Sequence, residues 1–316
     1  MATSGKLDDG TDDYVLPFST DKSGVRGRVV RLGKSVDTIL GRHGYPAAVS
    51  EALGQALALT AMLGSSLKPG GRLGLQTRTD GPIRMILADY EAPGRLRGYA
   101  GYDAAAVEAA SRAGHGRDAQ AKLLGNGHLA LTLERGPGEE QYQGIVALDG
   151  MSLGAAALAY FRQSEQLPSY VRLAVARERR AGGDGWHWRA GGLLIQHPTA
   201  SDVEDASDPD DEDRENWQRA RILAASVEDH ELLDPALSSE RLLLRLFHEE
   251  NVRIYQGQGL DVRCRCSKER VAMFLTRFTP TDLDTLREPD GSISVTCEFC
   301  STKYNFPAGS DLSTSE

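Results

Sequence analysis

The sequence predicts an α+β protein with a mixed antiparallel-sheet N-terminal domain and packed helices, a helical linker, and a small C-terminal four-cysteine domain. Three observations predict this class. Segments that alternate apolar and polar residues, separated by turn dipeptides, recur through residues 1–198. An acidic run and two helical patterns occupy residues 199–257, and all four cysteines of the chain lie in residues 258–316. We expect a domain boundary at each change of pattern.

A sheet is predicted in the N-terminal domain from short segments that are rich in β-branched residues or alternate in polarity. Three of them, in residues 71–100, are separated by Asp-Gly and Pro-Gly turns, which is typical of an antiparallel meander. We expect strands at residues 14–20, 25–33, 72–79, 82–90, 95–100, 128–134, 141–148, 171–178 and 186–196.

Two helices are predicted in the same domain from apolar residues that recur at helical spacing. The first covers residues 46–63, with Pro46 near its first turn and small alanines between the larger apolar residues. The second covers residues 152–166 and stops before Pro168. Each should bury one face against the sheet.

Residues 202–215 contain nine acidic residues and one arginine, so they carry −8 of the formal net charge of −9. Such a run cannot bury enough apolar surface to fold by itself, and we expect it to be disordered. Helices are predicted after it, at residues 214–227 and 240–249. The rest of the chain is nearly neutral, which argues against a nucleic-acid partner because that surface needs clustered Lys and Arg.

The N-terminal residues contain no apolar h-region of a secretory signal. The longest apolar run, residues 56–63, is less than half of the about 20 residues that a membrane-spanning helix needs. We therefore expect a soluble, cytoplasmic protein without a membrane partner. Cysteines in that compartment stay reduced, which favours metal ligation or redox chemistry over permanent disulfides.

The four cysteines form the pattern Cys264-x-Cys266, thirty intervening residues, then Cys297-x-x-Cys300. Two short loops that each present two thiolates to one point can hold zinc tetrahedrally, so zinc ligation is the favoured interpretation. Four unrelated buried cysteines or two ordinary disulfides are the alternatives. Thiols that are one residue apart repel each other once a metal leaves, which favours a site that can be oxidised. Residues 261–316 hold seven Lys and Arg against nine Asp and Glu, a balance that disfavours a zinc ribbon on nucleic acid.

Local signals predict how the two cysteine pairs meet. Ser267 is expected to cap a helix that runs to Leu275, and Thr279-Pro280-Thr281-Asp282 has the pattern of a capping box with Pro at the first helical position. Asp290-Gly291 should turn the chain. The segments ISV before Cys297 and KYNF after Cys300 can then pair as a hairpin with the second cysteine pair at its tip.

Three short motifs resemble enzyme or nucleotide sites but fail on their context. GRVVRLGKS at residues 27–35 has five residues between its glycines where a phosphate loop has four, and no clear helix begins there. GNGHLA at residues 125–130 leads into a strand pattern, so it is interpreted as a turn. HEE at residues 248–250 has Val252 where a metalloprotease needs its second histidine. No enzyme signature remains.

Longer motifs cover most of the chain: RGRVVRLG (26–33), HGYP (43–46), ALALTAMLG (56–64), GRLGLQ (71–76), LRGY (96–99), YQGIV (142–146), YFRQSEQLP (160–168), AGGLLIQ (190–196), LFHEE (246–250), CRCSKERV (264–271) and VTCEFC (295–300). In these motifs the sequence resembles the 33 kDa chaperonin family, the oxidation-activated holdase chaperones of bacteria. It departs from that family at Ser301, where a glycine is common, and in the length and charge of the acidic run.

The resemblance implies a redox-regulated, ATP-independent holdase that is not an enzyme. Reduced, it would hold zinc and be inactive; oxidised, it would carry the disulfides Cys264 with Cys266 and Cys297 with Cys300, which proximity within each pair favours. It would then dimerise, bind unfolded client proteins and pass them to ATP-dependent foldases. Five apolar residues of the linker helices are the expected client-binding residues: Trp217, Leu223, Leu243, Leu246 and Phe247. The alternative is a zinc-ribbon adaptor for a protein or RNA partner.

Overall fold

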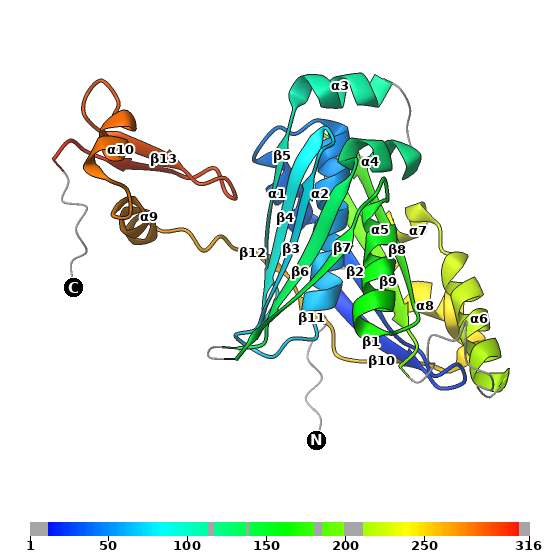
Figure 1. Ribbon diagram of the computed structural model, residues 1–316. Coiled ribbons are helices and arrows are strands. Elements are labelled where there is room, and N and C mark those ends of the chain that lie inside the picture. The colour runs from blue at the N-terminus through cyan, green and yellow to red at the C-terminus, as the bar shows by residue number, and fades with distance from the viewer. Residues whose placement is uncertain (1–11, 113–116, 137–138, 180–184, 199–210, 310–316) are drawn as a thin grey trace. The chain divides into compact units, whose positions relative to one another are not determined.

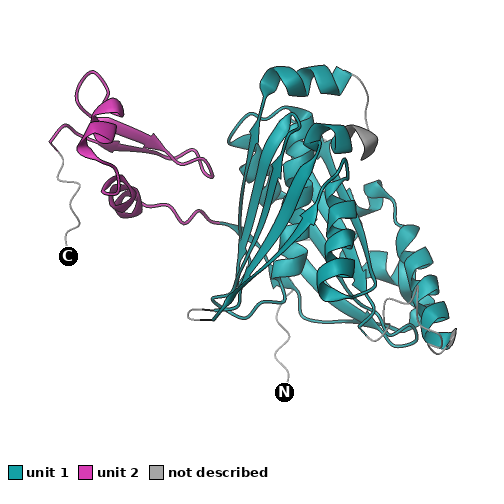
Figure 2. Ribbon diagram, in the orientation of Figure 1, with its two compact units in different colours: residues 1–262 teal, residues 263–316 magenta. Residues whose placement is uncertain are grey.

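The computed structural model describes residues 12–112, 117–136, 139–179, 185–198 and 211–309. It divides into two compact units, residues 1–262 and residues 263–316 (Figure 2). The second unit begins five residues after the boundary at 258 that the sequence suggests. The reason is that the residues just before Arg263 pair with strands of the first unit.

Unit 1 contains two six-stranded sheets, and every strand expected from the sequence is present in them (Figure 1). Sheet A is antiparallel throughout and has the order β10-β1-β2-β9-β8, with β11 also paired to β1. Its strands are β1 (Tyr14–Thr20), β2 (Arg26–Leu32), β8 (Ser169–Glu178), β9 (His187–Gln196), β10 (Val252–Ile254) and β11 (Gln258–Gly259).

Sheet B contains the predicted meander. Its order is β12-β5-β4-β3-β6-β7, and all pairs are antiparallel except β12 with β5. Residues alternate between buried and partly exposed along β3 and β5, as the sequence pattern requires. Its strands are β3 (Arg72–Thr79), β4 (Ile83–Glu91), β5 (Arg95–Tyr102), β6 (Gly127–Glu134), β7 (Gln141–Ala147) and β12 (Asp261–Val262).

Helix α2 (Ala47–Gly64) is the centre of the main core, because it contacts strands of both sheets. It begins directly after Pro46, as predicted, and Leu53 and Leu57 are completely buried. By length and composition α2 could cross a membrane, but 72% of its apolar window is buried inside the protein. Its apolar character is therefore explained by its place between the sheets.

Shortening a side chain at the centre of this core should destabilise unit 1 alone. Leu57→Ala removes a completely buried side chain, and such changes cost about 2–5 kcal/mol. We expect the free energy of unfolding of unit 1 to fall by that amount, seen as a lower denaturant midpoint by circular dichroism. The metal content of the cysteine unit, measured by elemental analysis, should stay unchanged. Leu244→Ala, at an exposed leucine, is the control. Equal stability of the two variants would contradict the assigned core.

Helix α1 (Lys34–Gly41) corrects the expectation that no helix begins after the glycine-rich segment at residues 27–35. Its first turn is capped by Asp13, whose carboxylate accepts hydrogen bonds from the backbone N–H of Gly33 (3.0 Å) and of Ser35 (3.1 Å). A cap that comes from twenty residues upstream leaves no local signature. The same carboxylate occupies the position that a phosphate would take at this helix terminus.

Unit 1 contains further helices besides α1 and α2. The predicted helix at 152–166 is present as α5 (Leu153–Tyr160), which continues into a π-helical turn at Phe161–Glu165. Three further helices were not predicted from the sequence: α3 (Ala104–Arg112), α4 (Arg117–Leu124) and α7 (Asp229–Leu233). These elements are short, and the described part of α3 buries only one residue, so they lack a long apolar stripe.

The two predicted linker helices are present as α6 (Asp211–Ala225) and α8 (Ser239–Phe247). They pack on sheet A and form a second core cluster, in which Phe247 lies against Phe18 with ring centroids 5.6 Å apart. The expected disorder of the acidic run is wrong for residues 211–215, which begin α6; residues 202–210 lie outside the described residues. Acidic residues suit the first turns of a helix because they oppose its dipole.

Candidate metal centre

Unit 2 (residues 263–316) is built from short elements whose ends are defined locally. Helix α9 (Lys268–Leu275) is capped by Ser267, whose hydroxyl accepts from the backbone N–H of Arg270 at 3.3 Å. Helix α10 (Pro280–Thr285) begins with the predicted capping box between Thr279 and Asp282. Both predictions are confirmed. These caps fix the path of the chain between the two cysteine pairs.

The second cysteine pair lies at the tip of the predicted hairpin of β13 (Ile293–Thr296) and β14 (Lys303–Phe306). The backbone N–H of Cys297 donates to Thr302 O at 2.9 Å, and that of Ser301 donates to Cys297 O at 2.8 Å. Ser301 has φ of +57°, a left-handed conformation that glycine adopts without steric cost. The departure from the family pattern therefore keeps the turn that a glycine would favour.

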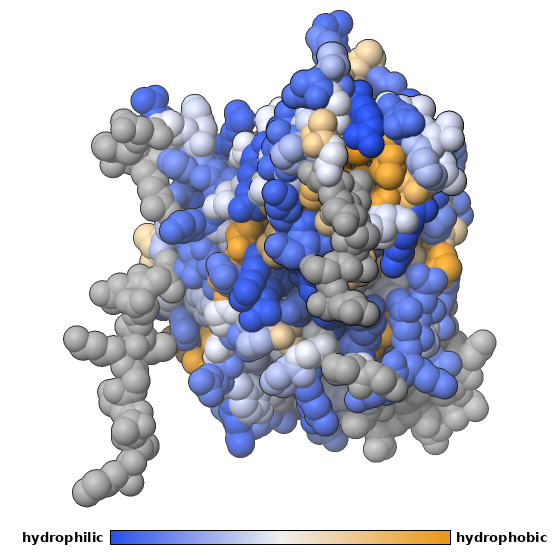
Figure 3. All heavy atoms as spheres, turned by 90° about the vertical axis from the view of Figure 1, so that its left-hand side faces the viewer, coloured by the Kyte–Doolittle hydropathy of each residue, from blue (hydrophilic) through white to orange (hydrophobic). Residues whose placement is uncertain are grey.

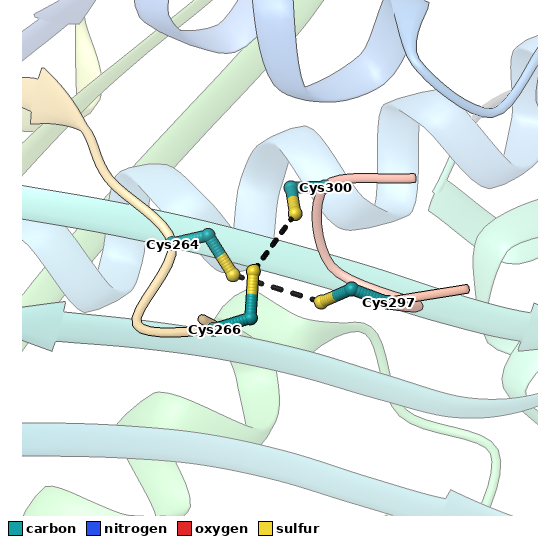
Figure 4. A group of neighbouring side chains, drawn as sticks. All are labelled: Cys264, Cys266, Cys297 and Cys300. Atoms are coloured by element: carbon teal, nitrogen blue, oxygen red, sulfur yellow. Dashed lines mark hydrogen bonds between the residues drawn. The ribbon is translucent and has the colours of Figure 1, made fainter. Parts of the chain in front are cut away.

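All four cysteine sulfurs lie within 4.8 Å of one another, so the structure brings the predicted ligands together (Figure 4). Cys264 and Cys266 come from one loop, Cys297 and Cys300 from the other, and the side chains point toward one another. Sulfur distances are 3.7 Å for Cys264 to Cys297 and 3.3 Å for Cys266 to Cys300. Four thiolates bound to zinc at ~2.3 Å have sulfur–sulfur edges of about 3.8 Å, so the donor set and its spacing fit a tetrahedral metal site.

Two hydroxyl groups contact these sulfurs. The hydroxyl of Tyr304 donates to Cys266 Sγ at 3.1 Å. The hydroxyl of Thr302 lies 3.2 Å from Cys300 Sγ; it accepts from a thiol, and it becomes the donor when that sulfur is a thiolate. These two residues were not singled out in the sequence. Both residues follow the CxxC motif closely, Thr302 just before β14 and Tyr304 within it. That position is the sequence signal that could have indicated them.

Cys266, Cys297 and Cys300 differ in how readily their thiols lose a proton. Burial raises the pKa of Cys266 to about 12 and also raises the pKa of Cys297. Burial acts in the same direction on Cys300, but hydrogen bonds with Thr302, Cys266 and Cys297 together outweigh it and lower that pKa to about 6. The lowered pKa favours the thiolate of Cys300, and thiolates are the form that binds metals and reacts with oxidants.

The five expected client-binding residues lie in unit 1, where the structure places them together on sheet A. Leu243, Leu246 and Phe247 are completely or almost completely buried, and Trp217 and Leu223 are partly buried against the same cluster. Their role in client binding stays a prediction. As they stand, most of their apolar surface is covered by the sheet.

Helices α6 to α8, residues 211–247, form what we call the helical segment. Two buried arginines of sheet A, which were not singled out in the sequence, hold it in place. Arg31 donates to the backbone oxygens of Asp234 at 2.8 Å and Glu231 at 2.9 Å, and Arg189 donates to Leu233 O at 2.6 Å. Arg31 is completely buried and Arg189 is 3% exposed. Because their acceptors are backbone carbonyls far along the chain, no spacing rule could have indicated them.

Residues 252–262, which we call the strap, connect the helical segment to the first cysteine pair. Val252 pairs with Thr20 on β1, Gly259 pairs with Tyr14 on the same strand, and Asp261 pairs with Arg95 on β5. The strap thus passes from the edge of sheet A to the edge of sheet B. Cys264 follows its last residue by two positions.

Comparisons with known proteins agree with this architecture. The family model described as Hsp33 protein matches residues 13–307. A 33 kDa chaperonin of Caulobacter vibrioides is 42% identical over 293 residues, covering 93% of this chain and 94% of the relative, and one of Ectopseudomonas mendocina is 37% identical over 299 residues, covering 94% and 93%.

Among solved structures, the crystal structure of the 33 kDa chaperonin (Heat shock protein 33 homolog) from Thermotoga maritima matches with a TM-score of 0.73 at 20% identity, covering 94% of this chain and 96% of that one. At that identity the likeness shows the fold. The family model spans nearly the whole chain, including both cysteine pairs, and the curated relatives cover 93% and 94% of it. The chain therefore belongs to the Hsp33 family of 33 kDa chaperonins.

Proposed function

We propose that this chain is a redox-regulated, ATP-independent holdase chaperone, bound to zinc and inactive when reduced, disulfide-bonded and active when oxidised. The observation that carries the proposal is the convergence of four thiolates in a unit with almost no other core. Only Leu275, Ile293 and Phe306 are buried apolar residues in the described part of unit 2. So small a core needs a further constraint to stay folded.

Zinc would supply that constraint, since a structural four-thiolate site contributes folding free energy and leaves no open position for catalysis. Cys264, Cys266, Cys297 and Cys300 would hold it. Oxidation removes these ligands. In each pair two thiolates give up two electrons, the O–O bond of one peroxide breaks, and with two protons the products are one disulfide and two waters. We propose the pairs Cys264 with Cys266 and Cys297 with Cys300.

Loss of the metal unfolds unit 2. The strap is then followed in the chain by an unfolded segment. The strap is held by short ladders, two residues each at β11 and β12 and three at β10, so it can detach in steps. The helical segment then loses one of its attachments to sheet A. Trp217, Leu223, Leu243, Leu246 and Phe247 would become available to unfolded clients, which bind exposed apolar surface.

The face drawn in Figure 3 is mostly hydrophilic, with hydrophobic residues in small separate patches. This agrees with a chaperone that is inactive until its helices move. Asp13 caps the helix that begins in the segment resembling a phosphate loop, so that segment gives no support for ATP binding. We further propose that the protein is cytoplasmic, is not an enzyme, dimerises when oxidised, and hands clients to ATP-dependent foldases.

Aggregation of a denatured client tests the proposed function. We expect the reduced, metal-loaded protein to have little effect on light scattering. After peroxide, near-stoichiometric amounts should suppress aggregation, in parallel with metal release followed by a chromogenic chelator, and dithiothreitol with zinc should reverse both. A zinc-ribbon adaptor would lose its metal without gaining this activity, so release without suppression would reject the holdase.

A further inference from the structure

Each cysteine pair of the metal centre receives one hydroxyl contact, and the two hydroxyls come from one strand and its preceding turn. Thr302 contacts Cys300, two residues before it on the same loop, at 3.2 Å. Tyr304 belongs to β14, yet its hydroxyl donates to Cys266 on the other loop at 3.1 Å. Tyr304 therefore links the hairpin to the CxC loop through a side-chain hydrogen bond.

The backbone explains how one strand reaches both pairs. Cys297 and Thr302 are joined by a backbone hydrogen bond of 2.9 Å at the end of the hairpin, and Tyr304 pairs with Val295 further along it. Thr302 directly precedes β14, and Tyr304 is the second residue of that strand. Both hydroxyls lie next to cysteine sulfurs.

We propose that Tyr304 and Thr302 are positioning residues that stabilise thiolate charge at Cys266 and Cys300, and so set how firmly zinc is held and how fast peroxide removes it. This rests on the proposed zinc site. Four thiolates around a divalent ion leave a net charge of about −2, which hydrogen-bond donors in the outer shell stabilise. A donor also withdraws electron density from the sulfur, which makes it a weaker nucleophile toward peroxide.

One sulfur in each pair has a hydroxyl partner close by: Tyr304 contacts Cys266, and Thr302 contacts Cys300. Both hydroxyls contact sulfurs of one cluster, so the double variant measures how strongly their effects on metal retention are coupled.

The test compares full-length Tyr304→Phe, Thr302→Val and the double variant with wild type. The matched controls are Tyr142→Phe, which removes the hydroxyl of a tyrosine that is 45% exposed in unit 1, and Thr276→Val, which removes one bonded to Met273 O in α9. Zinc transfer to a competing chelator is measured under reducing conditions, and zinc release is then timed after peroxide. Loss of an outer-shell donor typically weakens metal binding about 10- to 100-fold.

We expect each single variant to weaken zinc retention about 10-fold and to speed peroxide-driven release, with the controls unchanged. Cobalt substitution separates an electronic effect from a loosened fold. Removal of a donor should move the sulfur-to-cobalt charge-transfer band to lower energy while the ligand-field bands keep their tetrahedral intensity. Weaker binding with unmoved charge-transfer bands would mean that the hydroxyls only support the fold, and it would overturn the inference.

If both variants retained zinc as well as the controls do, the inference about Tyr304 and Thr302 would also be overturned. The proposed function would stand, because the wild-type protein would still bind and release zinc. Failure of the proposed function has a different signature, because the reduced wild-type protein would then hold no zinc at all. If Tyr304→Phe does not fold, Thr302→Val carries the same comparison on the other loop.

Discussion

Cys297→Ser should cost this protein its metal and the fold of unit 2 while leaving unit 1 intact. Cys297 supplies one of the four converging sulfurs, and its backbone also closes the hairpin tip through two hydrogen bonds. Structural zinc contributes an apparent ~10–16 kcal/mol to folding, and a three-thiolate site retains much less of it. Three buried apolar residues cannot replace that contribution.

Zinc content, near-stoichiometric in wild type and lost in the variant, measures the first half of this expectation. Amide exchange measures the second: residues 263–309 should lose protection, and β3 and β4 should keep it. Thr296→Ser, next to the ligand on an exposed position, is the control. Loss of cooperative unfolding in unit 1 would contradict the division into two units.

Truncation should activate the protein without an oxidant, and two end points separate the contribution of unit 2 from that of the strap. A chain ending at Gln256 loses unit 2 and also β11 and β12, together with Leu260 and Val262, which pack against the main core. A chain ending at Val262 loses unit 2 alone. If the strap carries the signal to the helical segment, the shorter chain should be the more active holdase in reducing buffer.

The helical segment opposes this release, because α8 buries four large apolar residues and two arginines bind the preceding backbone. The alternative is therefore that the helices stay on sheet A whatever happens after residue 256. Both truncated chains would then leave client aggregation unchanged, and Leu242 to Phe247 would remain protected from exchange. Equal activity of the two chains would instead assign the restraint to unit 2 and not to the strap.

Local chemistry made much of the cysteine unit predictable. The Ser267 cap, the Thr279–Asp282 capping box and the hairpin around CxxC each depend on residues within a few positions of one another, and all three are present. The convergence of the sulfurs followed from them. Strands of sheets A and B were also found from their own polarity patterns, because each pattern reports a face that the sheet buries.

Features that depend on distant residues were missed. Asp13 caps α1 from twenty residues away, and Arg31 binds carbonyls two hundred residues further along the chain. The strap has too few residues per strand to show alternation, so its pairing with β1 and β5 was not visible. The helices after the acidic run were expected to form a linker. Their core is completed by sheet A, whose residues are distant in the sequence.

The central claim is that oxidation of the cysteines releases the helices from sheet A, and amide exchange of the full-length protein before and after peroxide tests it most directly. We predict fast exchange in residues 211–249 after oxidation, with protection retained in the strands from Leu73 to Leu87 as part of a separate cooperative unit. Unchanged protection of residues 211–249 in protein that has lost its zinc would contradict the claim.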